Sequence, residues 1–404
     1  MSTTIPTLTE ADVVALASRS LQPATPGRGS VALEIEWIIV DSSDRSRPVR
    51  CDEVMSAAAG ELPCGGLLSI EPGGQLELTT ARHDGAREAL AAADADEAAL
   101  ANRLAASGMR MLATGLDLYR PPLRLLDLPR YRAMEGSWEA AGLDGRLATN
   151  STASIQVNLD FGQEPLVTWE RAGLVAPVLA AAFANSPHRA DDGSWRASAR
   201  WSVMAAFDPS RTRPVTTGSV QAWADYALDA LVFVISDGTD VLPVDPPFSL
   251  RRWVKEGHRF GYPDAEDVAV HLTTLFPPVR PRGWLECRFL DALPSRDREV
   301  AVLTVAALIG DDAPIADLRA AVDMDSDPWV LAPFGTTDRD MRHAVKRCLE
   351  LAITVLDTPS DGASAPLRAW VDRRRAAGWA IPAGAEDVAA ADLQSVVPLE
   401  QEIH

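Results

Sequence analysis

Residues 67–80 read LLSIEPGGQLELTT, and the alternation within them decides how the rest of the sequence is interpreted. Leu68, Ile70, Leu76 and Leu78 occupy even-numbered positions, whereas most of the polar side chains between them occupy odd-numbered ones. A period of two is typical of a β-strand that turns one face to the core and the other away from it. The stretch therefore predicts a strand with an apolar back and a polar front.

The polar front of this stretch is unusually acidic. A Pro-Gly-Gly run at 72–74 interrupts the strand, and because Pro is disfavoured inside a central strand we expect a bulge or a tight kink there. Glu71, Gln75 and Glu77 then lie close together on the face that is not core. Two carboxylates and an amide are costly in such a place unless something neutralises them. A divalent cation bound by carboxylate oxygens is the usual solution.

Three further segments, residues 31–40, 153–161 and 284–290, repeat the alternation. Their polar faces carry Glu34, Glu36, Gln156, Asn158, Glu286 and Arg288. A solvated polar face is the ordinary interpretation of any one such strand. Together, however, the four strands hold five Glu, no Lys and a single Arg, and like charges on facing strands repel. The set as a whole therefore predicts a metal site.

The composition limits the classes of function. The 404 residues include 38 basic and 57 acidic side chains, for a net charge of −19, which argues against nucleic acid or an anionic membrane as a partner. The apolar fraction of 47% is ample for a large core. We expect a cytoplasmic protein, because no signal pattern begins the sequence and no C-x-x-C pair joins the four cysteines, Cys51, Cys64, Cys287 and Cys348.

The remaining pattern alternates helices with loops. Periodicity predicts helices at 7–20, 84–107, 165–184, 298–309, 315–323, 338–356 and 364–377, and a helix followed by a strand at 221–236. Residues 109–118 predict a short strand, and we expect a loop from 120 through 134 and a rigid loop at 271–281. No linker is evident, so we expect one α+β catalytic domain over residues 1–404, mainly helical from about 296 to 404.

The common catalytic motifs are absent from the sequence. It has no Walker A loop, no H-E-x-x-H and no G-x-S-x-G, and its six His do not pair at ligand spacing. Residues 193–213 carry Arg196, Arg200, Arg211 and Arg213, which fit an anion site and surface salt bridges equally well. The remaining candidate chemistry is phosphoryl transfer, with carboxylate-bound Mg²⁺ and Arg neutralising phosphate oxygens.

Four motifs, in this order, resemble the glutamate–cysteine ligases of the plant and actinobacterial type. They are EPGGQLE at 71–77, TASIQVNLD at 152–160, NSP at 185–187 and LECR at 285–288. The segments TLFPPVR at 274–280 and RFLDA at 288–292 are most similar to the bacterial branch that supplies γ-glutamylcysteine for ergothioneine synthesis. The resemblance runs from about residue 30 to 292.

The resemblance implies a glutamine-synthetase-like fold, in which a curved, mostly antiparallel sheet forms a funnel with helices packed outside. It also implies a reaction. ATP phosphorylates the γ-carboxylate of L-glutamate, the amine of L-cysteine displaces the phosphate, and γ-glutamylcysteine is released with ADP. The product could serve ergothioneine, glutathione or another thiol. Oligomeric state is not predicted.

Residue roles follow from the resemblance as well. It implies two or three Mg²⁺ ions held by Glu34, Glu36, Glu71, Glu77 and Glu286. Gln75, Gln156 and Asn158 correspond to the substrate side of the sheet. Arg288 corresponds to an arginine that stabilises the transferring phosphoryl group, and Arg200 to one that meets either phosphate or the glutamate carboxylate. Glu77, Arg200 and Arg288 are the predicted catalytic residues.

Other functions fit the same residues. The chain could be a carboxylate–amine ligase with a different amine acceptor, or an inactive homologue that binds nucleotide or amino acid without turnover. A metal-dependent hydrolase using the same carboxylates would need no ATP. Because all five glutamates and Arg288 are present, an active ligase is favoured.

Overall fold

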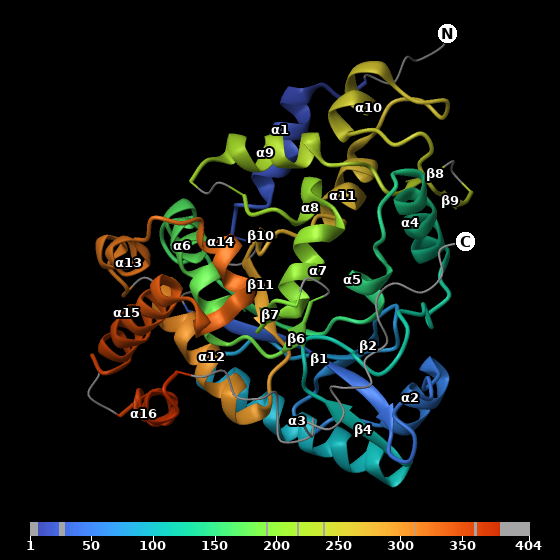
Figure 1. The fold of residues 1–404 in the computed structure, drawn as a ribbon. Coiled ribbons are helices and arrows are strands. Elements are labelled where there is room, and N and C mark those ends of the chain that lie inside the picture. The colour runs from blue at the N-terminus through green and yellow to red at the C-terminus, as the bar shows by residue number, and fades with distance from the viewer. Residues whose placement is uncertain are drawn as a thin grey trace.

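A seven-stranded sheet runs through the centre of the computed structural model, which describes residues 7–379 apart from 24–28, 191–192, 216–217, 237–238, 311 and 359–361 (Figure 1). Its order is β10 (Val279–Pro281), β11 (Leu285–Asp291), β5 (Ser154–Leu159), β1 (Val31–Asp41), β3 (Leu76–Thr79) and β2 (Leu67–Ile70). The seventh strand, β4 (Met109–Leu112), pairs with the end of β1. Each of these neighbours is antiparallel, and β10 and β2 are free edges, so the sheet is open rather than a closed barrel.

The register of the strands brings the predicted polar faces together. Glu34 of β1 lies opposite Gln156 of β5, and Glu36 lies opposite Glu77 of β3. On the other side of β5, Asn158 faces Glu286 of β11. Residues directly opposite each other in an antiparallel pair share a face of the sheet. The four amphipathic segments therefore form one continuous polar surface, as the alternation predicted.

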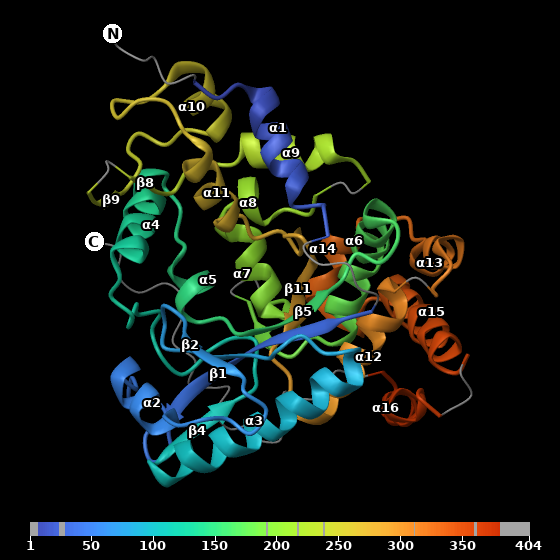
Figure 2. The same cartoon turned by 180° about the vertical axis from the view of Figure 1, so that it is seen from behind.

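Helices cover the apolar face. Leu33, Ile35, Leu78, Val157 and Cys287 are completely buried there. The helices packed on this side include α3 (Ala86–Ala106), α6 (Pro165–Ala182) and α12 (Ser295–Ile309), with α13 (Ile315–Val322), α15 (Arg339–Leu356) and α16 (Ala365–Ala376) outside them (Figure 2). The predicted helices are thus confirmed, with small shifts at their ends.

Shorter helices complete the fold, some of them around the polar face of the sheet. Three of them border it directly: α4 (Pro129–Ala140), α5 (Arg146–Asn150) and α7 (Ala199–Phe207). The rest are α1 (Glu10–Arg19), α2 (Cys51–Ala58), α8 (Pro209–Thr212), α9 (Val220–Asp229), α10 (Leu250–Glu256), α11 (Ala265–Thr273), α14 (Pro328–Leu331) and the 3₁₀ helix η1 (Ala332–Thr337). Two small hairpins pair β6 (His188–Arg189) with β7 (Trp195–Arg196), and β8 (Ile235–Ser236) with β9 (Val241–Leu242).

The prediction of a single kinked strand at 67–80 is wrong. The chain reverses at the Pro-Gly-Gly run, and β2 and β3 form a hairpin in which Ile70 lies opposite Leu76. Gly74 has a φ of +87°, which suits glycine, and a Cβ at Gly73 would lie 1.8 Å from the backbone oxygen of Asn150. Because Ile70 and Leu76 are directly opposite, their side chains share a face. The predicted faces are therefore correct although the connection is not.

The predicted loop at 120–134 is also partly wrong, since α4 begins at Pro129. Proline at the first helical position needs no hydrogen-bond donor and has a suitable φ. Met134 and Trp138 of this helix are buried. Packing against Phe207 and Phe233 stabilises a segment whose local sequence is rich in Arg and Pro.

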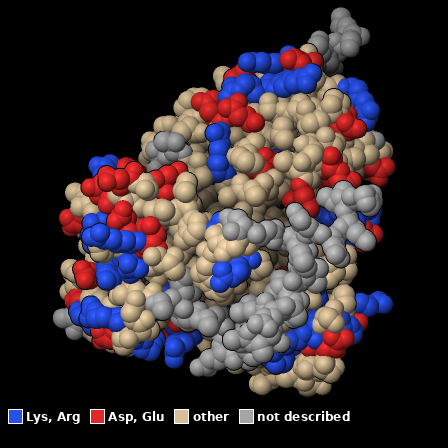
Figure 3. All heavy atoms as spheres, viewed as in Figure 1, with Lys and Arg blue, Asp and Glu red and all other residues tan. Residues whose placement is uncertain are grey.

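The surface agrees with the composition. Acidic and basic side chains are interspersed on the face drawn in Figure 3, without a continuous basic patch. Among the described residues, no helix is long and apolar enough to cross a membrane. The single catalytic domain stays a prediction, and residues 380–404 of its helical end lie outside the described residues.

Candidate active site

A cavity of about 240 Å³ lies between the polar face of the sheet and helices α4, α5 and α7. The sheet side contributes Glu36, Ser154 and Arg288, and the β2–β3 turn contributes Glu71 and Gln75. Arg200 of α7 also lines the cavity. The cavity thus brings together predicted residues that are more than 200 positions apart in the sequence.

Four of the predicted carboxylates, those of Glu34, Glu36, Glu71 and Glu77, lie on or beside β1 and the β2–β3 hairpin. Their partners are neutral. The backbone N–H of Ser154 donates to Glu36 at 2.8 Å, Asn158 Nδ2 donates to Glu34 at 3.0 Å, and Ser69 Oγ donates to Glu77 at 2.7 Å. Within the described part of the chain, no basic side chain forms an ion pair with any of the four.

The electrostatic cost of this arrangement appears in the pKa values. Burial, together with the charges of Glu36 and Glu77, raises the pKa of Glu71 to about 8. Burial likewise raises the pKa of Glu34, Glu36 and Glu77, and nearby carboxylates add to the shift at Glu34 and Glu77. Acids gathered without a cation hold protons more tightly than they do in water. These carboxylates are therefore suited to a positive ligand.

Glu286 is the exception among the five. It is completely buried, and its carboxylate accepts from Arg280 Nε at 2.5 Å, Arg288 Nη1 at 3.1 Å and Arg282 Nη1 at 3.2 Å. Burial alone would raise the pKa, but Arg280 and Arg288 outweigh it and hold the pKa of Glu286 at about 2. Its charge is thus neutralised within the chain.

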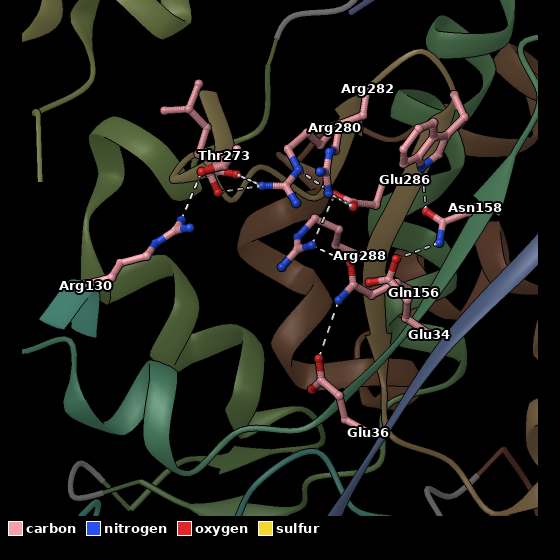
Figure 4. A network of polar contacts seen from close by, with 12 residues as sticks. Glu34, Glu36, Arg130, Gln156, Asn158, Thr273, Arg280, Arg282, Glu286 and Arg288 are labelled. Carbon is pink, nitrogen blue, oxygen red and sulfur yellow. Dashed lines mark hydrogen bonds and ion pairs between the residues drawn. The ribbon is translucent and has the colours of Figure 1, made fainter. Parts of the chain in front are cut away.

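Figure 4 shows how the amides connect the two groups of charges. Gln156 accepts a hydrogen bond from Arg288 and directs its amide nitrogen toward Glu36 at 3.5 Å. Asn158 accepts from Trp284 Nε1 at 3.0 Å while it donates to Glu34. Both amides therefore act as bridges, each between a group that donates and a carboxylate that accepts.

Gln75 and Arg200 differ from the other predicted residues because part of each side chain has no partner. Gln75 Nε2 donates to the carbonyl of Thr152 at 2.8 Å, but its Oε1 accepts nothing among the described residues. Arg200 Nη2 donates to the carbonyl of Arg288 at 3.0 Å, whereas its Nε and Nη1 find no hydrogen-bond acceptor in the described part of the chain. Arg200 is only 5% exposed. A buried guanidinium with free donors is suited to an anionic ligand.

The other arginines of the 193–213 cluster do not reach this cavity. Arg211 is buried against Asp208 and the carbonyl of Thr274, and Arg196 lies over the ring of Phe334. Of the four arginines in this cluster, Arg200 alone lines the cavity, and its role as an anion contact stays a prediction.

The chain was compared with known proteins. The model of glutamate–cysteine ligase family 2 matches residues 30–362. The chain belongs to this family.

Individual relatives agree with the family assignment. Glutamate–cysteine ligase EgtA of Mycobacterium tuberculosis is 36% identical over 366 residues, which cover 85% of this chain and 83% of that protein. The chloroplastic glutamate–cysteine ligase of Nicotiana tabacum is 28% identical over 275 residues, covering 64% of this chain and 51% of that protein. The protein described here is therefore an enzyme, a ligase.

A solved structure supports the fold of this ligase. The glutamate–cysteine ligase of Francisella tularensis, in complex with AMP, superposes with a TM-score of 0.52 and 12% sequence identity. The match covers 86% of this chain and 83% of that one. At this identity it bears on the fold alone, and it confirms the predicted class of an antiparallel sheet with helices outside.

Helix α4 adds cavity residues of the ligase that sequence reasoning missed. Tyr131, Met134 and Trp138 line the cavity, with Arg124 and Arg130 beside them. Arg124 Nε donates to Glu135 at 2.9 Å, and Arg130 Nη2 donates to Thr273 Oγ1 at 2.9 Å. The signal was Pro129 followed by apolar residues at helical spacing. Because the segment looked like a loop, none of its residues was proposed for the site.

Arg280 of the ligase is the second omission. Its side chain is buried, bonds Glu286 and also donates to the carbonyl of Leu275 at 2.6 Å. The segment around it was predicted as a rigid loop, whereas Val279–Pro281 forms the edge strand β10. In that strand Arg280 lies directly opposite Glu286. Only this pairing makes Arg280 part of the site.

The donor chemistry is the kind that Mg²⁺ prefers, because hard divalent cations bind carboxylate oxygens. Burial raises the pKa of Glu71 and the charges of Glu36 and Glu77 raise it further; a cation would relieve the part that is due to those charges. Among the described residues, no three acidic, His or Cys side chains converge closely enough to enclose an ion. The five predicted metal ligands therefore stay a prediction.

Proposed function

We propose that this ligase joins the γ-carboxylate of L-glutamate to the amine of L-cysteine and converts ATP to ADP and phosphate in doing so. In this proposal the γ-carboxylate is first phosphorylated, and the cysteine amine then displaces the phosphate to give γ-glutamylcysteine. Family membership supports the reaction. The observation that carries it is one cavity in which acidic side chains without cations face Arg200 and Arg288.

Mg²⁺ accompanies ATP in this proposal, as two or three ions. Glu34, Glu36, Glu71 and Glu77 would hold them, because no basic side chain in the described structure neutralises these four. Glu286 is a ligand only when it gives up part of its contact with the arginines. Bound Mg²⁺ would neutralise the negative charge of the phosphate oxygens during transfer.

The two arginines have separate roles in the proposal. Arg288 already lies between Glu286 and Gln156, and we assign it to the charge that develops on the transferring phosphoryl group. Arg200 offers free donors and is assigned to a substrate anion, either phosphate or the glutamate carboxylate. Gln75, Gln156 and Asn158 orient the substrates and the carboxylates around them.

The apolar part of the cavity protects the intermediate. An acyl phosphate is hydrolysed by water, so its site must exclude solvent. Trp138 and Phe207 are buried, and Phe276 lies beside them in the lining. These aromatic rings form the apolar side of the cavity, opposite the polar face of the sheet.

The test is ADP release by the purified protein with Mg²⁺, ATP, L-glutamate and a panel of amines, each component omitted in turn. Release that requires both glutamate and cysteine supports the proposal, and it is consistent with γ-glutamylcysteine formation for ergothioneine synthesis. ADP release with a different amine changes the acceptor, and metal-dependent turnover that needs no ATP indicates a hydrolase. Glu77→Gln, prepared in parallel, excludes a contaminating ligase.

A further inference from the structure

Asp291, the last residue of β11, is buried and collects hydrogen bonds from two distant segments. Its Oδ2 accepts from the backbone N–H of Asn185 and from Ser186 Oγ, both at 2.8 Å. Its Oδ1 accepts from Ser198 Oγ at 3.0 Å. The side chain is 1% exposed, so these contacts are shielded from water. One carboxylate thus connects the sheet to the 185–187 segment and to the start of α7.

Ser186 and Ser198 link the Asp291 carboxylate to the backbone of α7 through their hydroxyl groups. Ser186 Oγ, which donates to Asp291, accepts from the backbone N–H of Arg200 at 3.1 Å. Ser198 caps the helix, since its Oγ accepts from the N–H of Trp201 at 3.3 Å. Both hydroxyls are therefore fixed at one side by Asp291 and at the other by the first turn of α7. This is the turn that carries Arg200.

The guanidinium of Arg200 is held from the same end of β11. Its Nη2 donates to the carbonyl of Arg288, and its Nη1 lies 3.7 Å from Asp291 Oδ1, an ion-pair distance longer than a hydrogen bond. The contact with Asp291 orients the group without saturating its donors. The side chain lines the cavity with Nε and Nη1 still available.

The backbone at Gly115 packs closely against the Asp291 carboxylate. A Cβ added at Gly115 would lie 2.7 Å from Asp291 Cγ, which is closer than real side chains approach. The N–H of Gly115 also donates to the carbonyl of Asn185 at 3.0 Å. The position of the carboxylate is therefore set by backbone on one side and by hydroxyls on the other.

We propose that Asp291 is the positioning residue for Arg200, fixing the first turn of α7 so that the guanidinium meets an anionic oxygen of the substrate. The inference rests on the proposed function, because it takes Arg200 as a substrate contact. The anionic oxygen belongs either to a phosphate or to an amino-acid carboxylate, and the experiment distinguishes the two.

The experiment is a double-mutant cycle with Asp291→Asn, Arg200→Ala and both together. Initial rates of ADP release are measured against ATP, glutamate and cysteine separately. If Asp291 acts through Arg200, both single variants raise the KM of the same substrate by at least about tenfold, and the double variant stays within about twofold of Arg200→Ala. A raised KM for ATP identifies phosphate, and a raised KM for glutamate identifies the carboxylate. Multiplying effects in the double variant, or an unchanged KM in Asp291→Asn, would overturn the inference.

Asp208→Asn is the matched control. Like Asp291, Asp208 is buried and pairs with a buried arginine, Arg211, at 2.8 Å; it caps the short helix α8 but does not line the cavity. The control should lose stability while the KM of every substrate stays unchanged. A control that reproduces the KM change of Asp291→Asn would show that any buried Asp–Arg pair has this effect, and would overturn the inference.

Two further measurements keep the result decisive. Gly115→Ala displaces the Asp291 carboxylate without removing its charge. It provides a second test if Asp291→Asn fails to fold, because it should raise the KM of the same substrate. An unchanged KM would count against the inference.

Calorimetric measurement of ATP and L-glutamate binding reports on the substrate contact of Arg200 without requiring turnover. The inference holds if Asp291→Asn binds ATP or L-glutamate at least about tenfold more weakly than the wild type does, even if neither protein releases ADP and the proposed function fails. Equal affinities of the wild type and the variant overturn the inference.

Discussion

Glu71 and Glu286 belong to the same acidic face, but their pKa values are shifted in opposite directions. That of Glu71 is raised to about 8, and that of Glu286 is held at about 2. Burial pushes both values upward, so burial does not explain the difference. Glu71 is surrounded by other carboxylates, whereas Glu286 contacts Arg280, Arg282 and Arg288.

The comparison shows that one acidic face contains two kinds of region. Around β1 and the β2–β3 hairpin, the carboxylates have only neutral partners, and their repulsion favours an added cation. At β11 the chain provides the cations itself. The first region is therefore the one to which we assign the proposed metal, whereas the charge of Glu286 in the second is already balanced by arginines.

Glu286→Gln should have the largest effect, because it removes the carboxylate that contacts three arginines. Breaking a buried ion pair from one side costs about 3–5 kcal/mol, so we expect the free energy of unfolding to fall by that amount. Turnover should also be abolished. Denaturant unfolding and ADP release measure the two effects.

The contrasting variant is Glu71→Gln in the other region. It removes one of several repelling carboxylates, so the metal-free protein should become more stable rather than less. Equal destabilisation by Glu71→Gln and Glu286→Gln would contradict the division into two regions.

Glu77→Gln should reduce kcat on the order of 10³-fold, since a lost metal ligand removes several kcal/mol of charge stabilisation. Among the described residues, the Glu77 carboxylate accepts a hydrogen bond from Ser69 alone, and Glu77 lies opposite Glu36, so the metal-free fold should remain intact. Glu53→Gln on α2, which pairs with exposed Arg47, is the control and should leave kcat unchanged. Turnover near the wild-type rate would remove Glu77 from the proposed metal ligands.

Arg288→Lys should lower kcat by about 10²-fold, a smaller effect than loss of a ligand. Lysine retains the charge but cannot contact Glu286, Gln156 and a phosphate oxygen at once, because it lacks the planar fork of donors. Steady-state rates with saturating ATP and glutamate test this expectation. A near-normal kcat would show that charge alone is sufficient at this position.

The smallest expected effect is a pH dependence of metal stabilisation. The pKa of Glu71 in the folded protein, about 8, exceeds its ordinary value of 4.5. Its contribution to stability is therefore complete below pH 4.5 and is lost as the pH rises through 8. Mg²⁺ should restore what is lost, so it should raise Tm by at least about 2 °C more at pH 8.5 than at pH 6.

Glu286 provides the internal contrast for this measurement. Its pKa of about 2 lies below 4.5, so its contribution is complete above pH 4.5 and is lost only as the pH falls through 2. Its contribution is therefore the same at pH 6 and at pH 8.5 and should not add to the difference in Tm between them. A Mg²⁺-dependent rise in Tm that is equal at both pH values would contradict the assignment of the metal to the Glu71 region.

The alternation of residues predicted most of the polar face. Glu34, Glu36 and Glu77 on neighbouring strands, and Gln156 and Asn158 on the next strand, all lie where their parity placed them. Parity is a local property, so it was not affected by the mistaken connection between β2 and β3. The family motifs supplied the expected family and fold; the family model confirmed the family, and the structural neighbour confirmed the fold.

Helix α4 and strand β10 were predicted poorly for a common reason. Both are short and begin or end at Pro, and both depend on partners far away in the sequence. Met134 and Trp138 make α4 a helix by packing against Phe207 and Phe233, and Val279 pairs with Cys287 across β10. Short segments of this kind have too little local signal to specify their structure.

The sequence by itself determined that one face of the sheet would be apolar and the other rich in carboxylates, because side-chain direction in a strand follows from residue number alone. Only the tertiary structure decided which of those carboxylates would have a cation. Arg280 meets Glu286 through the pairing of β10 with β11, and Asp291 reaches Arg200 through segments about 100 residues away. Electrostatic interactions depend on distance in space, and the folded chain alone sets that distance.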